Sequence, residues 1–125
     1  MSKNFLEHFE LCVTRMENGT AEVQLEILPH HTNSAGIVHG GVLAGVADTV
    51  AGAAAFSVLD DTQRVVTTDM HITYLKNVTV GTVTARADLR HKGNRFMSVR
   101  VEICSGNDLL VTGSVSFMVV ARKID

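Results

Sequence analysis

The chain has 125 residues, of which 46% are hydrophobic and 19% charged, and its formal net charge is -2. This composition excludes an extensively disordered protein and predicts one globular domain over residues 1–125. The small net charge gives no reason to expect nucleic acid or an anionic membrane as a partner. The N-terminal segment lacks a basic and apolar leader, so we expect a cytoplasmic protein.

Residues 9–28 have the pattern of a β-hairpin. Asn18-Gly19 favours the positive φ angles of a tight turn. Apolar residues alternate with polar ones on both sides of this turn: Leu11, Val13, Val23, Leu25 and Ile27. Pro29 then ends the second strand, and the segment up to His39 is predicted to be a loop.

Residues 40–58 predict one long helix with an unusual composition. It contains no Lys, Arg or Glu, and Asp48 is its only carboxylate before Asp60. An apolar stripe is expected at Leu43, Val46, Ala47, Val50, Ala54 and Val58. Most other positions are Gly, Ala or Thr, so a sheet and a second copy of the chain are expected to cover the helix between them. Gly45 and Gly52 each lower helix propensity by about 1 kcal/mol relative to Ala, which a close backbone approach would explain.

Four strands are expected after the helix, at residues 65–75, 82–90, 96–104 and 109–121. The 82–90 segment places apolar residues on one face and polar residues, including Arg86 and Arg90, on the other, as in an antiparallel sheet. The resulting order is ββαββββ, an α+β fold. Cys12 and Cys104 lie within strand patterns and lack C-x-x-C spacing, so we expect free, buried thiols.

Two features near the helix suggest chemistry. Asp48 lies in a segment that is otherwise built for burial, so it either fixes packing through hydrogen bonds or acts as a general base or nucleophile. Gly40-Gly41 leaves backbone N–H groups at the positive end of the helix dipole, where they can stabilise an oxyanion or simply allow a tight turn.

The spacing of Gly40 and Asp48 limits how they can cooperate. Eight residues of helix separate them by roughly 12 Å, too far for both to touch one carbonyl group. Joint action therefore requires Gly40 of one subunit and Asp48 of another, as two antiparallel helices in a twofold homodimer would allow.

The stretch HTNSAGIVHGGVLAGVADTVAGAAAF, followed by TTDMHITYLKNV, resembles the hotdog-fold thioesterases. Within this family it is similar to the phenylacetic-acid-pathway and 4-hydroxybenzoyl-CoA thioesterase branch. The resemblance covers nearly the whole chain and implies a sheet wrapped around a central helix, homodimers that often pair into tetramers, and acyl-CoA hydrolysis without a metal or organic cofactor.

The resemblance also implies roles for individual residues. Asp48 corresponds to the catalytic carboxylate and Gly40 to the amide that polarises the thioester carbonyl. Asn33 would hold the carbonyl or the attacking water, and His39 would order the turn before Gly40. Thr67 would help to hold the water. Strict alternation places Thr67 with Asp69 and His71, and Thr68 with Val66, Met70 and Ile72, so a small bulge could turn either threonine inward.

Gly41, Arg90 and Arg95 are further candidates for substrate or CoA binding. The basic cluster around residues 86–95 is either a solvated turn or a clamp for the CoA phosphates. His30 and His31 lack the additional ligands of a metal site, so no metal is expected. An acyl-CoA-sensing module without turnover is the alternative function, and the acyl group itself, aryl or short- to medium-chain, stays open.

Overall fold

A computed structural model of the chain describes residues 4–122, which form two α-helices, one 3-10 helix and six strands. The helices are α1 (Phe5–Phe9), η1 (Pro29–His31) and α2 (Gly40–Phe56). The strands are β1 (Cys12–Glu17), β2 (Thr20–Glu26), β3 (Gln63–Tyr74), β4 (Thr82–Lys92), β5 (Phe96–Ser105) and β6 (Asp108–Ala121).

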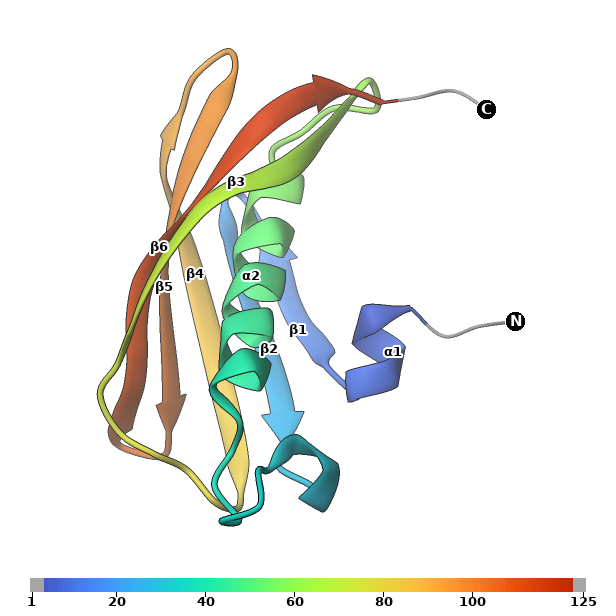
Figure 1. Cartoon of the computed structure of the whole chain (residues 1–125). Helices are drawn as coiled ribbons and strands as arrows, with labels where there is room; N and C mark the ends of the chain where they lie inside the picture. Colours follow the sequence, from blue (N-terminus) through green and yellow to red (C-terminus); the bar gives the residue numbers. More distant parts are fainter. Residues whose placement is uncertain (1–3, 123–125) are drawn as a thin grey trace.

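All six strands belong to one antiparallel sheet with the order β1-β2-β4-β5-β6-β3. The sheet curves around α2, which lies along its concave face, while α1 lies on the other side of α2 (Figure 1). Strands β1 and β3 form the two edges. The ββαββββ order predicted from the sequence is therefore confirmed, with α1 and η1 as additions that were not predicted.

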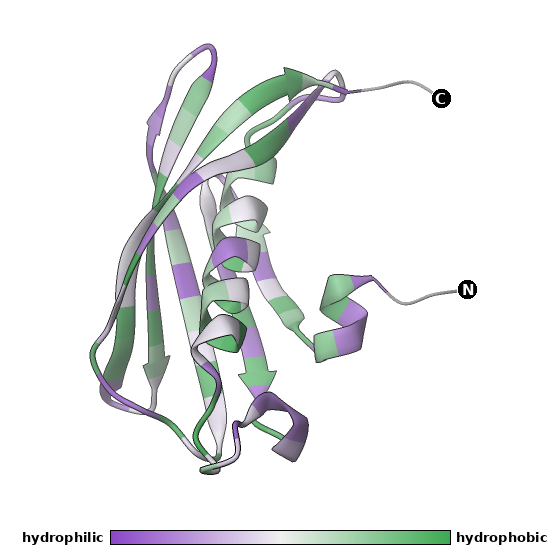
Figure 2. Cartoon of the chain, viewed as in Figure 1, coloured by the Kyte–Doolittle hydropathy of each residue, from purple (hydrophilic) through white to green (hydrophobic). Residues whose placement is uncertain are grey.

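The core lies between α2 and the concave face of the sheet. Strand β4 buries its apolar face and exposes Arg86 and Arg90, as its alternation predicted. The buried residues of α2 are Leu43, Val46, Ala47, Val50, Ala51, Ala54 and Ala55. Figure 2 shows this helix as apolar or neutral along most of its length, with a hydrophilic turn in its middle.

Local turn chemistry explains why the first hairpin forms where it does. Asn18 and Gly19 have φ angles of 49° and 81°, so both adopt the left-handed conformation that a two-residue hairpin requires. The predicted hairpin is confirmed. Strand β2 buries alternate residues, whereas every residue of β1 is exposed.

Three sequence predictions need correction. The long helix ends at Phe56, so Val58 lies beyond it. Both cysteines are free thiols, but Cys12 is exposed, because β1 is an edge strand, and Cys104 is only half-buried, near the end of β5. The tight contact at Gly45 is with the ring of Phe5, since a Cβ built at Gly45 would lie 2.7 Å from Phe5 Cζ.

At Gly52 no close approach occurs among the described residues, so an approach by a second copy of the chain stays a prediction. A Cβ built there meets no atom within 4 Å. Among the residues described, no helix combines the length and hydropathy needed to cross a bilayer.

Candidate functional site

The start of α2 is capped by the residue that precedes it. His39 occupies the N-cap position, and its Nδ1 accepts a hydrogen bond of 2.9 Å from the N–H of Gly41. The N–H of Gly40 has no acceptor among residues 4–122. Because the first amides of a helix lie at the positive end of its dipole, the Gly40 N–H is an open donor for an anionic oxygen. The Gly41 amide is already occupied.

A cleft of about 460 Å³ adjoins this helix start. It is lined by Asn33, Gly40, Gly41 and Tyr74, with residues of the loops on either side. Asn33 closes a compact turn, because its Oδ1 accepts hydrogen bonds from the N–H groups of Ala35 (2.9 Å) and Ile37 (3.2 Å). Its Nδ2 has no acceptor within the described residues, and Asn33 lines the cleft, so this group is available to donate to a bound molecule.

Tyr74 supports the helix start and was not singled out from the sequence. Its hydroxyl donates a 2.8 Å hydrogen bond to the carbonyl oxygen of Gly40, and its ring lies 3.6 Å from a Cβ built at Gly40. The contact connects the last residue of β3 to the first residue of α2. The only sequence signal for this role is the alternation of residues at the end of β3, which places Tyr74 on the face of the strand that points toward α2.

Asp48 lies in the middle of α2, on the side next to the edge strand β3. It is half-buried, less covered than the sequence suggested. Its Oδ1 accepts a hydrogen bond of 2.8 Å from the hydroxyl of Thr67. No backbone N–H of residues 4–122 donates to it, so within this part of the chain the carboxylate does not cap a helix or a turn.

A β-bulge directs Thr67 toward Asp48. The register between β3 and β6 shifts between Thr67, which pairs with Phe117, and Asp69, which pairs with Ser116. Because Phe117 is buried on the concave face, Thr67 shares that face, and Thr68 instead donates to the carbonyl of Ser116. A bulge is therefore present in β3, and it turns Thr67 rather than Thr68 toward α2.

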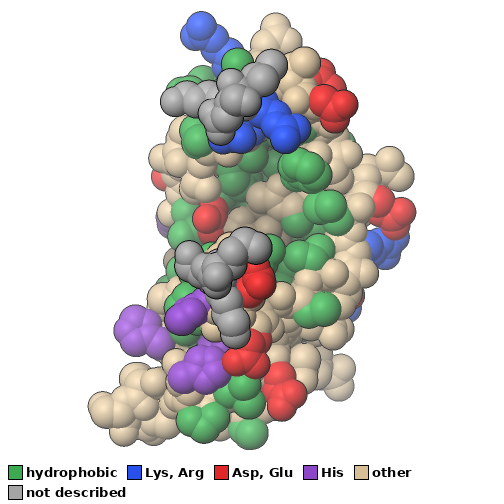
Figure 3. Space-filling model, turned by 90° about the vertical axis from the view of Figure 1, so that its right-hand side faces the viewer, with side chains coloured by type: hydrophobic (Ala, Val, Ile, Leu, Met, Phe, Trp, Pro, Cys, Tyr) green, Lys and Arg blue, Asp and Glu red, His purple; other side chains and the backbone are tan. Residues whose placement is uncertain are grey.

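The protomer thus contains two separate clusters that are candidates for parts of one site. The first, the Gly40 half-site, comprises Asn33, His39, Gly40 and Tyr74; the second, the Asp48 half-site, comprises Asp48 and Thr67. Both are built on α2, and its geometry separates Gly40 from Asp48 by about 12 Å. The surface beside α1 and α2 carries dispersed hydrophobic side chains, with histidines gathered toward one end (Figure 3).

The two predicted basic residues lie elsewhere. Arg90 lines a depression of about 260 Å³ on the convex face of the sheet together with Arg100, so it does not border either half-site. Arg95 is exposed in the turn between β4 and β5. That turn reaches the end of α2, where the Nζ of Lys92 donates a 3.0 Å hydrogen bond to the carbonyl of Val58.

The sequence of residues 35–112 matches the model of a known family, the thioesterase superfamily. The chain belongs to the thioesterase superfamily. The matched segment contains α2 and β3, and so it contains Gly40, Tyr74, Asp48 and Thr67. Membership supports a hydrolase with the hotdog fold.

The chain is similar to three individual proteins over most of its length. The chain is 30% identical to conserved protein PA5202 from Pseudomonas aeruginosa, with a TM-score of 0.91 and 96% of each chain covered. It is 26% identical to the proofreading thioesterase EntH of Klebsiella pneumoniae over 77% of this chain and 70% of that protein. A hypothetical thioesterase protein from Streptococcus pneumoniae, solved with coenzyme A, shares the fold at 21% identity, a TM-score of 0.86 and coverage of 95% and 93%.

Proposed function

We propose that this protein hydrolyses an acyl-CoA thioester to a free acid and CoA. The observation that carries the proposal is the pair of half-sites on α2: an unoccupied amide donor at Gly40 and a carboxylate at Asp48 that Thr67 orients. Coenzyme A bound to a relative of the same fold supports CoA as the leaving group.

The Gly40 half-site is proposed to bind the thioester carbonyl. The Gly40 N–H donates to the carbonyl oxygen, and this hydrogen bond strengthens as negative charge develops there, because the helix dipole acts in the same direction. The Nδ2 of Asn33 donates to the same oxygen or to the attacking water. His39 and Tyr74 fix the turn through the Gly41 amide and the Gly40 carbonyl.

Asp48 is proposed to supply the reacting carboxylate. As a general base it takes a proton from water, whose oxygen attacks the carbonyl carbon; the carbon–sulfur bond then breaks and the CoA thiolate leaves with the electron pair. As a nucleophile it forms an acyl anhydride and expels the same thiolate, after which water hydrolyses the anhydride. Thr67 orients Asp48 in either route.

The two half-sites require a second copy of the chain. We propose a homodimer in which Gly40 of each protomer meets Asp48 of its partner. Strand β3 is an unpaired edge of the sheet, and large hydrophobic side chains along it are exposed, namely Val66, Met70 and Tyr74. An edge of this kind is a natural pairing surface, so β3 of two copies can form one continuous sheet. Dimers pair further into a tetramer in this proposal.

The phosphates of CoA are proposed to contact the basic turn that contains Arg95, since this turn lies beside the C-terminal end of α2. A contact from Arg90 would have to reach the nucleotide from the convex face of the sheet. We infer membership of the phenylacetic-acid-pathway and 4-hydroxybenzoyl-CoA branch from the resemblance alone, and the acyl group, aryl or short- to medium-chain, stays open.

Release of CoA from a panel of aryl and aliphatic acyl-CoAs tests this function directly. Wild type is expected to turn over at least one member, and Asp48→Asn, which preserves size and a hydrogen-bond acceptor, is expected to lose activity by orders of magnitude while staying folded. Binding of acyl-CoA without turnover of any member would instead identify a ligand-sensing module. Full activity in Asp48→Asn would contradict the mechanism.

A further inference from the structure

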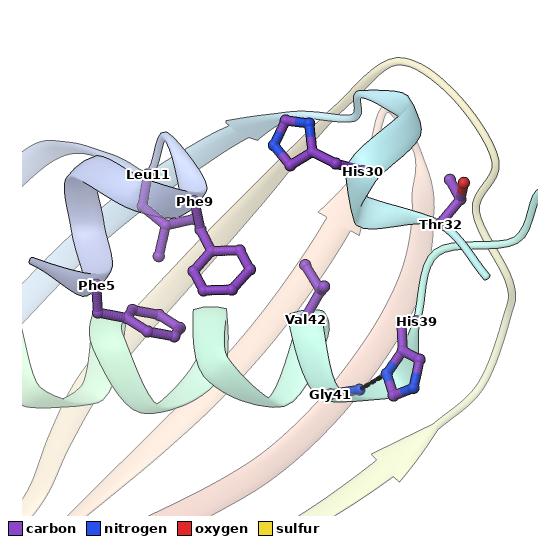
Figure 4. Close-up of a pocket in the computed structure, with 8 residues that line it drawn as sticks. All are labelled: Phe5, Phe9, Leu11, His30, Thr32, His39, Gly41 and Val42. Atoms are coloured by element: carbon purple, nitrogen blue, oxygen red, sulfur yellow. Dashed lines mark hydrogen bonds between the residues drawn. The ribbon is translucent and has the colours of Figure 1, made fainter. Parts of the chain in front are cut away.

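A second cavity, distinct from the cleft at Gly40, lies between α1 and the first turns of α2. Its volume is about 320 Å³. Figure 4 shows the rings of Phe5 and Phe9, the side chain of Leu11 and that of Val42 around one space, with α1 on one side and α2 on the other. The two rings lie 4.8 Å apart at an angle of 43°. A single aromatic ring would meet apolar surface on several sides there.

The polar groups of this cavity are confined to one end. His39, Gly41, His30 and Thr32 lie toward the start of α2, whereas the end beneath α1 is apolar (Figure 4). Gly41 lines both this cavity and the cleft that contains Gly40, so the polar end adjoins the proposed carbonyl site. No Lys, Arg, Asp or Glu of the described residues lines the cavity.

Specific contacts hold α1 in place above the cavity. His31 is fully buried; its Nδ1 accepts a 2.9 Å hydrogen bond from the N–H of Leu28, so its Nε2 carries the proton and donates to the carbonyl of Phe9 at 3.1 Å. The missing side chain of Gly45 makes room for the ring of Phe5. The cavity is therefore a built feature rather than a chance gap beneath a loose segment.

We propose that this cavity binds the acyl group of the substrate and selects uncharged acyl groups about the size of one aromatic ring. The proposal rests on the thioester function proposed above: with the carbonyl oxygen on the Gly40 N–H, the acyl group extends past Gly41 between Phe9 and Val42. The volume is at the lower limit for small-molecule sites, which disfavours long fatty acyl chains. A terminal carboxylate on the acyl group would reach the apolar end beneath α1, where no Lys or Arg of the described residues lines the cavity.

Binding of matched CoA thioethers tests the proposal without requiring turnover. Phenacyl-CoA, acetonyl-CoA and 4-carboxyphenacyl-CoA share one linkage and differ only in the group that would enter the cavity. Titration calorimetry on wild type is expected to show phenacyl-CoA binding about ten- to a hundredfold more tightly than acetonyl-CoA, as burial of a ring predicts. The carboxylated analogue is expected to bind no more tightly than acetonyl-CoA.

Two variants and one control locate the effect. Phe9→Ala removes one wall of the cavity and is expected to weaken phenacyl-CoA binding about tenfold. Gly45→Ala displaces the Phe5 ring without removing apolar surface and is expected to weaken phenacyl-CoA binding several-fold. Neither variant is expected to change the affinity for acetonyl-CoA. Phe56→Ala alters an exposed ring at the other end of α2 and is expected to change neither.

The outcomes separate this proposal from the proposed function. The proposed role of the cavity would be overturned if wild type bound phenacyl-CoA and acetonyl-CoA equally. It would also be overturned if Phe9→Ala and Gly45→Ala both kept the wild-type selectivity between these two ligands. Hydrolysis of benzoyl-CoA, measured in parallel, tests the thioesterase function on its own. Selective binding without hydrolysis would preserve the cavity and overturn the catalytic assignment.

Discussion

The Thr67 hydroxyl donates a 2.8 Å hydrogen bond to Asp48 Oδ1, joining the edge strand β3 to the only carboxylate of α2. The contact depends on the bulge that follows Thr67, because regular alternation would turn this side chain to the convex face. It fixes one carboxylate oxygen and leaves the other free to meet a substrate or a water molecule held by a partner.

Removing the Thr67 hydroxyl tests whether this orientation matters for the reaction. Thr67→Val keeps the β-branched shape and is expected to lower kcat about tenfold, the effect of losing one hydrogen bond to a charged group, with little change in KM. Thr67→Ser retains the donor and is expected to be much closer to wild type. Thr68→Val is the matched control, since Thr68 bonds Ser116 and not Asp48; an equal loss in both valine variants would indicate a general effect on β3.

The Gly40 amide can be removed with little disturbance of the helix. Gly40→Pro eliminates the N–H at the first helical position, where proline is well tolerated, and His39 already has φ -63° and ψ 132°, which suit a residue before proline. Loss of one oxyanion donor is expected to reduce kcat by about a hundred- to a thousandfold. Gly40→Ala keeps the N–H, and its Cβ would make ordinary contact with Tyr74, so it is expected to lose far less. Similar activity in the two variants would argue against the amide.

His31 is expected to contribute to stability through its two hydrogen bonds. His31→Phe preserves a ring but leaves the Leu28 N–H and the Phe9 carbonyl without this partner, so the free energy of unfolding is expected to fall by about 1–3 kcal/mol. Urea denaturation measures the change. His30→Phe provides the comparison, because His30 is exposed and its replacement is expected to stay within about 0.5 kcal/mol of wild type.

The carboxylate of Asp60, in the turn between α2 and β3, is expected to make the stability of the folded state depend on pH in the acid range. The Thr62 hydroxyl and then the Thr62 N–H donate to the carboxylate of Asp60, and these bonds lower its pKa below the ordinary value. A lowered carboxyl pKa stabilises the folded state above the unfolded pKa, and this contribution is lost as pH falls through the folded pKa. NMR titration of Asp60 is expected to show its pKa rising toward the ordinary value in Thr62→Val and remaining low in Thr62→Ser. An unchanged pKa in Thr62→Val would show that the hydroxyl is not the cause.

Much of the fold was predictable because its signals are local. Period-two alternation, Asn18-Gly19 and an uninterrupted apolar helix each specify an element within a few residues. Helix α1 has only five residues, too few to establish an apolar period, and its position depends on contacts distant in sequence, such as His31 with Phe9. Its one local signal is Asn4, whose Oδ1 caps the N–H of Glu7.

The site was predictable to a different degree at each residue. The helix pattern alone separates Gly40 from Asp48, but whether Thr67 or Thr68 faces inward depends on a bulge whose position alternation does not specify. Tyr74 meets Gly40 only through tertiary structure. The exposure of Arg90 on the convex face followed from the alternation of β4, which grouped Arg90 with Arg86 on the polar side.

A hybrid dimer tests most directly whether the site is completed between protomers. Asp48→Ala and Gly40→Pro are each expected to be inactive, and mixing them with subunit exchange creates hybrids that contain one intact Gly40–Asp48 site across the interface. Random exchange of equal amounts is expected to restore about a quarter of wild-type activity, because half of the dimers are hybrids and each has one of two sites. No recovery, despite hybrids verified by mass spectrometry, would contradict a site shared between protomers.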